Sequence, residues 1–571
     1  MQQFNFLNLN VMYKVSLLFI GIVALILNAN GQNSSTQSFQ ATHRYLKIPI
    51  KNGAPKRHVE VWLGNDKVRW FDAELADSTY DWIAYLDIGK WKGQHLKVVS
   101  NTSDKEIPLF NPIAQSDTDD NDKVYAEDRR GQFHFSAKRG WLNDPNGLVF
   151  FNGQYHLFFQ HNPYGTNWGN MHWGHAVSSD LLHWKELGEA LYPDESGVMF
   201  SGGAVVDSNN TAGFGKNGVT SPMILFYTAA EKSWGQGLAY SLDGQKFEKM
   251  PNHILDKITA GNRDPKVIWY GPSKQWVLVL YVEEDQEQHT MQIFTSKDLK
   301  MWTFASKIKG GRGNDRYLFE CPEFFELAVD GNPNNKKWVL TGANSQYAIG
   351  EFDGKSFHPE IERLFSQYGR DYYAAQTFSN EPKKRRIEIG WWRTHTNQGN
   401  FAFNQSMSIP MELKLKSTEK GIRLFREPVT ELQKLRKEKL SISRKKISSN
   451  DSSLFQQFNA EIAELDLVID PQQAKNIQIN VRGLAINYNV STEELLVDNV
   501  RAQVPLRNKK LALKLLVDRT GLELFAQNGE VYMPINYNFD RNNLTYQLVA
   551  FNGEAVLESA DLYTLDGIWI K

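Results

Sequence analysis

A short motif repeats along the middle of the chain and constrains the fold more than any other feature. In each copy an Asp is followed four residues later by a large aromatic residue, and successive copies lie 63, 55 and 55 residues apart. The copies are Asp180 with Trp184, Asp243 with Phe247, Asp298 with Trp302, and Asp353 with Phe357. Repeats of this length, built from several short strands, are typical of a β-propeller, in which radial sheets bury their faces on one another.

Two strand patterns accompany every copy of this motif. A short alternating segment precedes each Asp, at residues 174–178, 237–241, 291–296 and 347–352. A hydrophobic segment lies further back, at residues 155–160, 223–227, 276–281 and 338–341. A fifth set of strands fits between residues 372 and 413. A two-residue motif can recur by chance, but recurrence with strands in matching places predicts a five-bladed β-propeller over residues 126–430.

The segment ahead of the repeats also shows β-structure. Residues 45–100 alternate short β-rich runs with turn signals such as Asn52-Gly53, which predicts a small β-sandwich-like module. Residues 101–130 are polar and acidic, so we expect an exposed linker there. Module and linker together are placed at residues 32–125.

The segment behind the repeats is predicted to form a second β-sandwich. Residues 432–445 are basic and compatible with a helical connector, and alternating strands resume from residue 454 onward. An Asn528-Gly529 turn signal separates two of these strands. Residues 431–571 are therefore assigned to a connector and a C-terminal β-sandwich, and the fold class of the whole chain is all-β.

The first residues have the pattern of an export signal. Lys14 precedes an apolar run over residues 15–27 that is too short to span a bilayer comfortably, and small residues follow it. We expect a signal peptide at residues 1–31, an exported protein in the periplasm or outside the cell, and no stable membrane anchor; an anchor is the alternative reading. Cys321 is the single cysteine, so no intramolecular disulfide can form.

Charge and composition limit the class of partner. Lys plus Arg number 64 against 65 Asp plus Glu, which gives a net charge of -1 and no electrostatic basis for binding nucleic acid. We therefore expect an uncharged partner. The chain holds 16 Trp, 22 Tyr and 33 Phe, which suits a protein that stacks rings on sugars but equally suits a β-rich core. Whether the protein is a monomer or a homo-oligomer stays open.

Three acidic residues share one position in the repeat. Asp144 lies 36 residues before Asp180, Asp264 lies 34 before Asp298, and Glu320 lies 33 before Asp353. Equivalent positions in a propeller point the same way, so these carboxylates converge on one axial pocket if the position is on the innermost strands. Like charges gathered there cost stability and indicate function. The turn dipeptides around Asp144 offer a purely structural reading of that segment.

Paired carboxylates suit the hydrolysis of an acetal. One attacks the sugar or steers water, and the other, with a raised pKa, protonates the leaving oxygen. Histidines at 134, 156, 161, 172, 175 and 183 invite a metal hypothesis, but no familiar ligand spacing completes it. We predict no metal and no cofactor. The absence of G-x-S-x-G, Walker and G-x-G-x-x-G patterns argues against acyl transfer, phosphoryl transfer and dinucleotide chemistry.

Four short motifs resemble those of a known enzyme family. Residues 141–147, Phe200-Ser201-Gly202, Arg263-Asp264-Pro265 and Glu320-Cys321-Pro322 look like the signatures of glycoside hydrolase family 32, the β-fructosidases that include invertases, inulinases and levanases. The resemblance implies a five-bladed propeller with a β-sandwich behind it, and hydrolysis of fructofuranosides with retention of configuration. It makes Asp144 the nucleophile, Asp264 the transition-state stabiliser and Glu320 the acid/base.

The same resemblance implies a pocket for a terminal fructose. Its members would be Asn143, Gln160, Trp168, Phe200, Ser201, Arg263, and Trp391 or Trp392, of which Trp391 is our choice. The leading module is similar to one found ahead of fructanases of the Bacteroidetes kind, which indicates a fructan or fructo-oligosaccharide substrate such as levan or inulin, with sucrose as a further candidate. We expect this module to help engage long fructans and to be dispensable for chemistry.

Several alternatives remain open at this stage. A non-catalytic sugar-binding propeller would recruit fructan without cleaving it, although three filled acidic positions argue against it. A five-bladed arabinanase-type enzyme would lack the motifs at Trp141 and Glu320 in this form. Neither the linkage (β-2,6 or β-2,1) nor terminal as against internal cleavage follows from the motifs, because the loops that wall the pocket carry no readable code.

Overall fold

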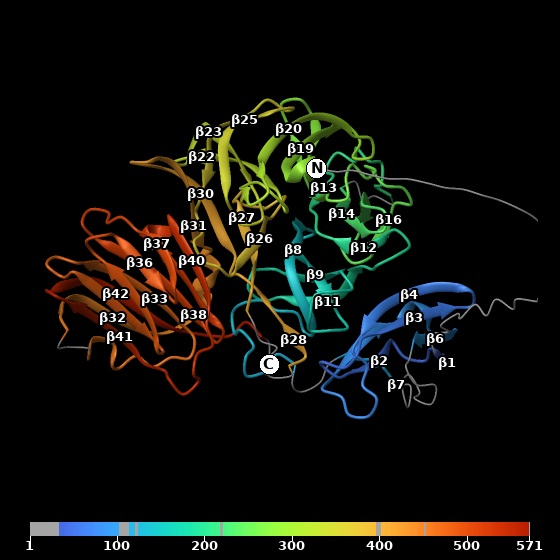
Figure 1. Ribbon diagram of the computed structural model, residues 1–571, viewed down its shortest axis with the longest axis horizontal. Coiled ribbons are helices and arrows are strands. Elements are labelled where there is room, and N and C mark those ends of the chain that lie inside the picture. Colours follow the sequence, from blue (N-terminus) through green and yellow to red (C-terminus); the bar gives the residue numbers. More distant parts are fainter. Residues whose placement is uncertain are drawn as a thin grey trace, which may run out of the picture.

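The computed structural model describes residues 34–101, 114–119, 124–216, 221–394, 401–449 and 453–569. The predicted signal peptide lies outside these residues. Figure 1 shows three β-rich bodies: the N-terminal module (blue), a central domain (teal to yellow) and a C-terminal sandwich (orange to red) on the other side of it. Apart from short 3-10 turns, the regular elements of the described residues are strands, so the predicted all-β class is confirmed.

The N-terminal module consists of two small sheets packed around one core. One has the order β1-β6-β3-β4 and the other β5-β2-β7. Alternate residues such as Val59 and Val61 face the shared core. The strands are β1 (Ser34–Gln40), β2 (Tyr45–Ile50), β3 (Arg57–Leu63), β4 (Asp66–Ala73), β5 (Trp82–Asp87), β6 (His95–Asn101) and β7 (Ala114–Ser116).

The predicted exposed linker at residues 101–130 is wrong in two respects. Its middle forms β7, which pairs antiparallel with β2 and so belongs to the module. Its last residue is buried: Arg130 is fully enclosed and donates hydrogen bonds to Glu127 and to the Ala137 carbonyl. The Tyr125 ring stacks on Trp569 near the far end of the chain, with centroids 4.2 Å apart. Polar composition did not show these long-range contacts.

The central domain contains three five-stranded sheets and one nine-stranded sheet. Apart from β28 (Phe403–Asn404), the first three sheets follow one another along the chain. The two halves of the nine-stranded sheet are joined by a single parallel pair between β22 (Glu323–Val329) and β30 (Met411–Thr418). The first sheet has β8 (Gly140–Phe151), β9 (Gln154–Asn162), β10 (His172–Ser178), β11 (Lys185–Leu191) and β28 (Phe403–Asn404). The second has β12 (Gly197–Phe200), β13 (Ala204–Val206), β14 (Met223–Glu231), β15 (Gly235–Ser241) and β16 (Glu248–Lys249).

The strands predicted around each repeat are confirmed in these sheets. The third sheet has β17 (Arg263–Tyr270), β18 (Gln275–Glu284), β19 (Gln288–Ser296), β20 (Thr303–Arg312) and β21 (Asp315–Arg316). The nine-stranded sheet has β22 (Glu323–Val329), β23 (Asn332–Thr341), β24 (Tyr347–Phe352), β25 (Phe357–Leu364), β26 (Tyr372–Thr377), β27 (Ile387–Trp392), β29 (Ser406–Met407), β30 (Met411–Thr418) and β31 (Gly421–Pro428). The alternating segment before each repeated Asp forms β10, β15, β19 or β24.

The repeated Asp has a structural role that explains its recurrence. Each copy follows one of these strands, and its carboxylate accepts hydrogen bonds from the backbone N–H groups two and three residues further on. This side-chain-to-backbone pattern fixes a turn into the next strand. Burial raises the pKa of Asp180, but the bonds from His183 and Leu182 outweigh it and hold that pKa at about 2.

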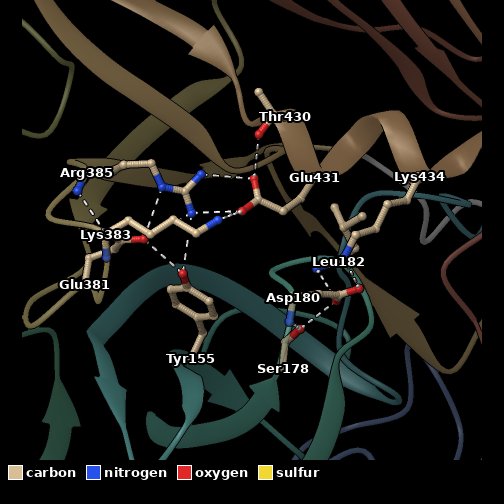
Figure 2. A network of polar contacts seen from close by, with 10 residues as sticks. All are labelled: Tyr155, Ser178, Asp180, Leu182, Glu381, Lys383, Arg385, Thr430, Glu431 and Lys434. Carbon is tan, nitrogen blue, oxygen red and sulfur yellow. Dashed lines mark hydrogen bonds and ion pairs between the residues drawn. The ribbon is translucent and has the colours of Figure 1, made fainter.

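A polar network ties the first sheet to the last part of the central domain (Figure 2). The Tyr155 hydroxyl of β9 donates to Glu381, 3.0 Å away. Arg385 pairs with Glu381 at 3.0 Å and with Glu431 at 2.9 Å. Glu431 lies in the 3-10 turn η4 (Thr430–Leu435), which leads into the sandwich. The network therefore holds the beginning and the end of the central domain together.

The C-terminal sandwich packs a six-stranded sheet on a five-stranded one. The predicted helical connector is wrong, because β32 (Arg436–Ile447) forms an edge strand there. Leu440 and Ile442 of β32 pack on the core while its Lys residues face solvent, a two-residue period that suits a strand. The others are β33 (Ala463–Asp470), β34 (Asn476–Val481), β35 (Leu484–Asn489), β36 (Glu494–Val497), β37 (Val500–Gln503), β38 (Leu511–Asp518), β39 (Gly521–Ala526), β40 (Val531–Asn536), β41 (Tyr546–Phe551) and β42 (Ala555–Leu565).

Buried ionic contacts join the sandwich to the central domain. His134 lies between Asp518 at 2.7 Å and Glu523 at 3.3 Å, all three fully buried. Burial lowers the pKa of His134, but bonds to these two carboxylates outweigh it and raise that pKa to about 9. Within the described ranges, no helix has both the length and the apolar character needed to cross a membrane.

Candidate active site

The three acidic residues meet in one cavity. Asp144 lies on β8, Asp264 on β17, and Glu320 three residues ahead of β22. β17 is the edge strand of the third sheet, and β8 is near the edge of the first, where only the two-residue β28 lies beyond it. Two of the three side chains therefore come from strands at or near a sheet edge and the third comes from the segment just ahead of β22, and all three line a cavity of about 210 Å³.

Local irregularities aim these carboxylates into the cavity. The pairing of β8 with β9 shifts register between Leu142 and Pro145, the interval that holds Asp144, and that of β17 with β18 shifts between Arg263 and Lys266. Bulges of this kind re-aim side chains next to functional sites. Asp264 and Glu320 also have left-handed backbone, with φ of 66° and 48°. Strained non-glycine residues of this kind cluster at active sites.

The structure brings nine of the ten predicted site residues together. Besides the three acidic residues, the cavity is lined by Asn143, Gln160, Trp168, Phe200, Ser201 and Arg263. Trp168 is 49% exposed and its ring meets Phe200 edge to face, with centroids 6.0 Å apart. One wall of the cavity is thus apolar and the other is ionic. The roles assigned to these residues remain predictions.

Trp391 is the predicted residue that does not line the cavity. Its ring lies one layer back, 6.3 Å from the Tyr373 ring and 5.9 Å from the Trp141 ring, and its Nε1 donates to Gln405. The alternative, Trp392, is fully buried against His134. Trp391 is therefore better placed than Trp392, but it touches residues next to the cavity and does not line the cavity itself.

Asp144 sits in a polar but enclosed position. The Ser201 hydroxyl donates to Asp144 Oδ2 over 2.8 Å. Burial raises the pKa of Asp144, with Glu320 adding to the rise, while hydrogen bonds from Asn143 and Ser201 oppose it. A carboxylate that has lost most of its water but keeps one or two donors is suited to attack an electrophilic carbon.

The surroundings of Asp264 raise the pKa of its carboxyl group. The backbone N–H of Cys321 donates to Asp264 Oδ2 over 2.9 Å. Burial raises the pKa of Asp264 to about 7, with Glu320 and Asp144 adding to the rise and Arg263 opposing it. Asp264 therefore loses its proton near neutral pH.

Glu320 differs from the expectation of a raised pKa for the acid. Arg263 Nη2 pairs with its Oε1 over 2.7 Å, and the Tyr373 hydroxyl donates to its other oxygen. Burial raises the pKa of Glu320, but the charge of Arg263 and these two hydrogen bonds outweigh it, so the net shift is downward. Sequence reasoning placed Arg263 next to Asp264 and missed that its guanidinium reaches Glu320.

Cys321 bridges two of the carboxylates. Its Sγ lies 3.7 Å from Asp144 Oδ2 and 3.5 Å from Asp264 Oδ2. Burial, and then the neighbouring carboxylates, raise the pKa of the thiol well above its ordinary value. The group is therefore a neutral S–H donor and not a thiolate nucleophile.

Tyr373 is the site residue that the sequence analysis missed. It lies on β26, the first strand of the set predicted between residues 372 and 413, and it lines the cavity. The three acidic residues have equivalent positions. Asp144 and Asp264 lie on the first strand of their sets, and Glu320 lies just ahead of the first strand of its set. The start of the fifth set of strands was therefore the signal in the sequence that pointed to Tyr373. It was missed because only acidic residues were considered at that position.

The histidines of the metal hypothesis have structural partners. His161 pairs with Glu189 at 2.8 Å, His183 with Asp180 at 3.1 Å, and His156 contacts His175 at 2.9 Å. Within the described ranges, no group of three or more His, Cys, Asp or Glu side chains is placed to hold a metal ion.

Comparison with known proteins places the chain in a family. Residues 134–428 match the glycosyl hydrolases family 32 N-terminal domain, and residues 431–564 match the glycosyl hydrolases family 32 C-terminal domain. A levanase from Bacillus subtilis (strain 168) is 36% identical over 490 residues, which cover 78% of this chain and 72% of that protein. An extracellular exo-inulinase from Aspergillus niger is 29% identical over 521 residues, covering 78% and 96%.

Solved structures agree with this placement. The exo-inulinase from Aspergillus awamori superposes with a TM-score of 0.70 at 27% identity, covering 78% of this chain and all of that one. Fructan 1-exohydrolase IIa from Cichorium intybus shares the fold, with a TM-score of 0.64 at 20% identity. The N-terminal family domain spans all three carboxylates, and the two domains together show that this protein belongs to glycoside hydrolase family 32.

Proposed function

We propose that the protein releases fructose from β-fructofuranosides, chiefly fructans, with retention of configuration. The observation that carries the proposal is the meeting of Asp144, Asp264 and Glu320, from segments in or next to three different sheets, in one cavity. A levanase and exo-inulinases among the relatives support a fructan substrate. Sucrose, whose fructose unit has the same ring and linkage carbon, is a further substrate of this proposal.

In the first step, Asp144 attacks the anomeric carbon of the fructosyl unit. The carbon–oxygen bond to the leaving group breaks as an ester to Asp144 forms, and Glu320 gives its proton to the departing oxygen. In the second step, Glu320 takes a proton from water, the water oxygen attacks the same carbon, and the bond to Asp144 breaks. Two inversions give net retention.

Substrate binding has to move the shared proton. In the empty cavity Arg263 and Tyr373 keep Glu320 ionised, while burial favours the proton on Asp264. Sugar hydroxyls that bind Asp264 and Arg263 stabilise the ionised Asp264 and weaken the Arg263–Glu320 ion pair. The proton then resides on Glu320, where the first step needs it, and the ionised Asp264 stabilises the positive charge of the transition state.

The size of the cavity supports cleavage at chain ends. Its volume of about 210 Å³ is below the ~300–1,000 Å³ of pockets that enclose drug-sized ligands. A cavity of this size has room for one sugar ring. We therefore favour release of single fructose units over internal cleavage, for both β-2,6 and β-2,1 fructans.

The proposal includes the domain layout. Residues 1–31 are a signal peptide, residues 32–125 the N-terminal module with its connection, residues 126–430 a five-bladed propeller and residues 431–571 the C-terminal part. The nine-stranded sheet supplies two of the five blades, joined by the single parallel pair. Relatives described as extracellular support an exported protein.

The test is chromatography of products from levan, inulin and sucrose. Early release of fructose alone from both polymers supports the proposal, and early accumulation of oligosaccharides would replace it with an internally cleaving enzyme. Binding of fructan without any product would favour the non-catalytic propeller instead. The Asp144→Asn protein serves as the matched control for contaminating activity.

A further inference from the structure

One wall of the cavity is carried by a loop that the N-terminal module holds. The loop, residues 163–171, connects β9 to β10 and carries Trp168 into the cavity. In Figure 1 the module lies beside the first sheet, with β4 on the side that faces the central domain. Three successive residues of β4 contact the central domain, and two of them contact this loop.

The first contact is a ring stack inside the module core. The rings of Phe71 on β4 and Tyr164 of the loop lie 3.8 Å apart at 22°. Both side chains are almost completely buried, and Tyr164 belongs to the same hydrophobic cluster as the module's own core residues. A residue of the catalytic domain is therefore built into the core of the module.

The second contact is a reciprocal pair of hydrogen bonds. The backbone N–H of Asp72 donates to Asn170 Oδ1 over 2.8 Å, and Asn170 Nδ2 donates to the Asp72 carbonyl over 2.7 Å. β4 is the edge strand of its sheet, so these backbone groups have no neighbouring strand. The amide of Asn170 takes the place of one residue of a missing strand.

Hydrogen bonds within the loop connect Asn170 to the backbone next to Trp168. Asn170 has left-handed backbone with φ of 45°, directly after Gly169. Its amide also donates to Asn162 Oδ1 over 2.9 Å, and Asn162 Nδ2 donates to the Asn167 carbonyl over 2.8 Å. Bonds therefore fix the backbone two residues after Trp168 and immediately before it.

The third contact continues the apolar wall outward. Trp70 of β4 packs on a small buried cluster that contains Met171, the last loop residue. Phe200, which lines the cavity, packs on the same cluster. Module, loop and cavity wall thus form one packed unit.

We propose that β4 of the N-terminal module, through Phe71 and the backbone of Asp72, positions the Trp168 loop, with Asn170 as the positioning residue. This inference rests on the proposed function. It opposes the expectation that the module is dispensable for chemistry, because loss of the hold would disturb the pocket for a single fructose and not only for long chains.

The test is a double-mutant cycle between Asn170 and Trp168. Asn170→Gly removes the clamp but keeps the left-handed backbone that glycine tolerates. We expect a roughly 10- to 100-fold loss of kcat/KM on sucrose and on levan alike. In a Trp168→Ala background, the same change should cost less than about 2-fold, because both substitutions act through one ring. Equal losses in the two backgrounds would overturn the proposal.

The control is Asp72→Ala at the other half of the clamp. It removes the side-chain pair with His58 at 2.7 Å but keeps the backbone groups that hold Asn170. Its kcat/KM should equal that of the wild type, and melting curves establish that every variant is folded at the assay temperature. A loss in Asp72→Ala as large as in Asn170→Gly would contradict the assignment of the clamp to the backbone.

Hydrogen exchange separates this proposal from the proposed function. Amides of residues 164–171 should exchange faster in Asn170→Gly than in the wild type or in Asp72→Ala. Unchanged exchange would refute the clamp whatever the activity. Absence of fructose release by the wild-type protein would refute the proposed function, and the exchange measurement would still decide whether the clamp exists.

Discussion

The two walls of the cavity are built in different ways. The ionic wall comes from strands of the central domain, where Asp144, Asp264 and Glu320 share one repeat position. The apolar wall at Trp168 comes from a loop that depends on another module for two of its anchors. The first wall is set by position within a repeat, and the second by contact between segments distant in sequence. Substitutions should therefore affect the two walls differently.

Loss of the nucleophile should have the largest effect. Asp144→Asn keeps the shape of the side chain but removes the group that forms the ester, so kcat should fall by roughly 10⁴-fold or more. The melting temperature should not fall, because the substitution relieves repulsion among the acidic residues. Purified protein assayed on levan and sucrose provides the measurement. Wild-type turnover by the Asp144→Asn protein would show that Asp144 is not the nucleophile.

Loss of the acid should depend on the leaving group. Glu320→Gln should slow natural substrates by roughly 10²- to 10⁴-fold. An aryl fructoside with a good leaving group should be slowed far less in the fructosyl-transfer step, because its oxygen departs without a proton. Comparison of initial rates on both substrates measures this difference. Equal losses on both would show that Glu320 is not the acid.

Loss of the module should affect short and long substrates alike. Deletion of residues 32–125 removes β4 and uncovers Tyr164, so we expect a roughly 10- to 100-fold loss of kcat/KM on both sucrose and levan, with a lower melting temperature. Assays of both substrates, made below the melting temperature, check this expectation. A loss confined to the Michaelis constant for levan would show instead that the module only captures long chains.

The smallest effect is expected from the loss of the Tyr373 hydroxyl, which lies beside Glu320 in the ionic wall. Asp264 should lose its proton near its pKa of about 7, and because this proton is the one that substrate binding moves to Glu320, kcat/KM should fall above that pH. Tyr373→Phe removes a bond that stabilises ionised Glu320, which raises the pKa of Glu320. The alkaline limb should therefore move to higher pH. A limb that moves to lower pH would contradict this role of Tyr373.

The sequence was sufficient for the features that are local or repeated. The strands and the acidic positions follow from periodicity, and the repeated Asp proved to be a turn-forming residue whose bonds reach only two and three residues ahead. The first strand of each set could be aligned by counting from that turn. Because the distance to the turn is nearly the same in each set, Asp264 and Glu320 could both be identified as candidate site residues from the sequence.

The remaining features depend on contacts that no local pattern records. β32 is basic like a solvated helix, and only its pairing with β42 makes it a strand. β7 lies in an acidic stretch, and its pairing with β2 decides its structure. The downward pKa shift of Glu320 follows from a guanidinium 57 residues away in the chain. No pattern in the sequence indicated a role for Asn170, because its side chain binds the backbone of Asp72, and a backbone group can belong to any residue type.

The retaining mechanism through Asp144 is most directly tested by transfer to methanol. Methanol competes with water for the fructosyl ester, and the methyl fructofuranoside that forms keeps the configuration in which it leaves the enzyme. NMR of that product from levan or sucrose distinguishes the anomers. The account predicts the β-anomer, the configuration of the substrate. Formation of the α-anomer would mean a single displacement and would contradict Asp144 as the nucleophile.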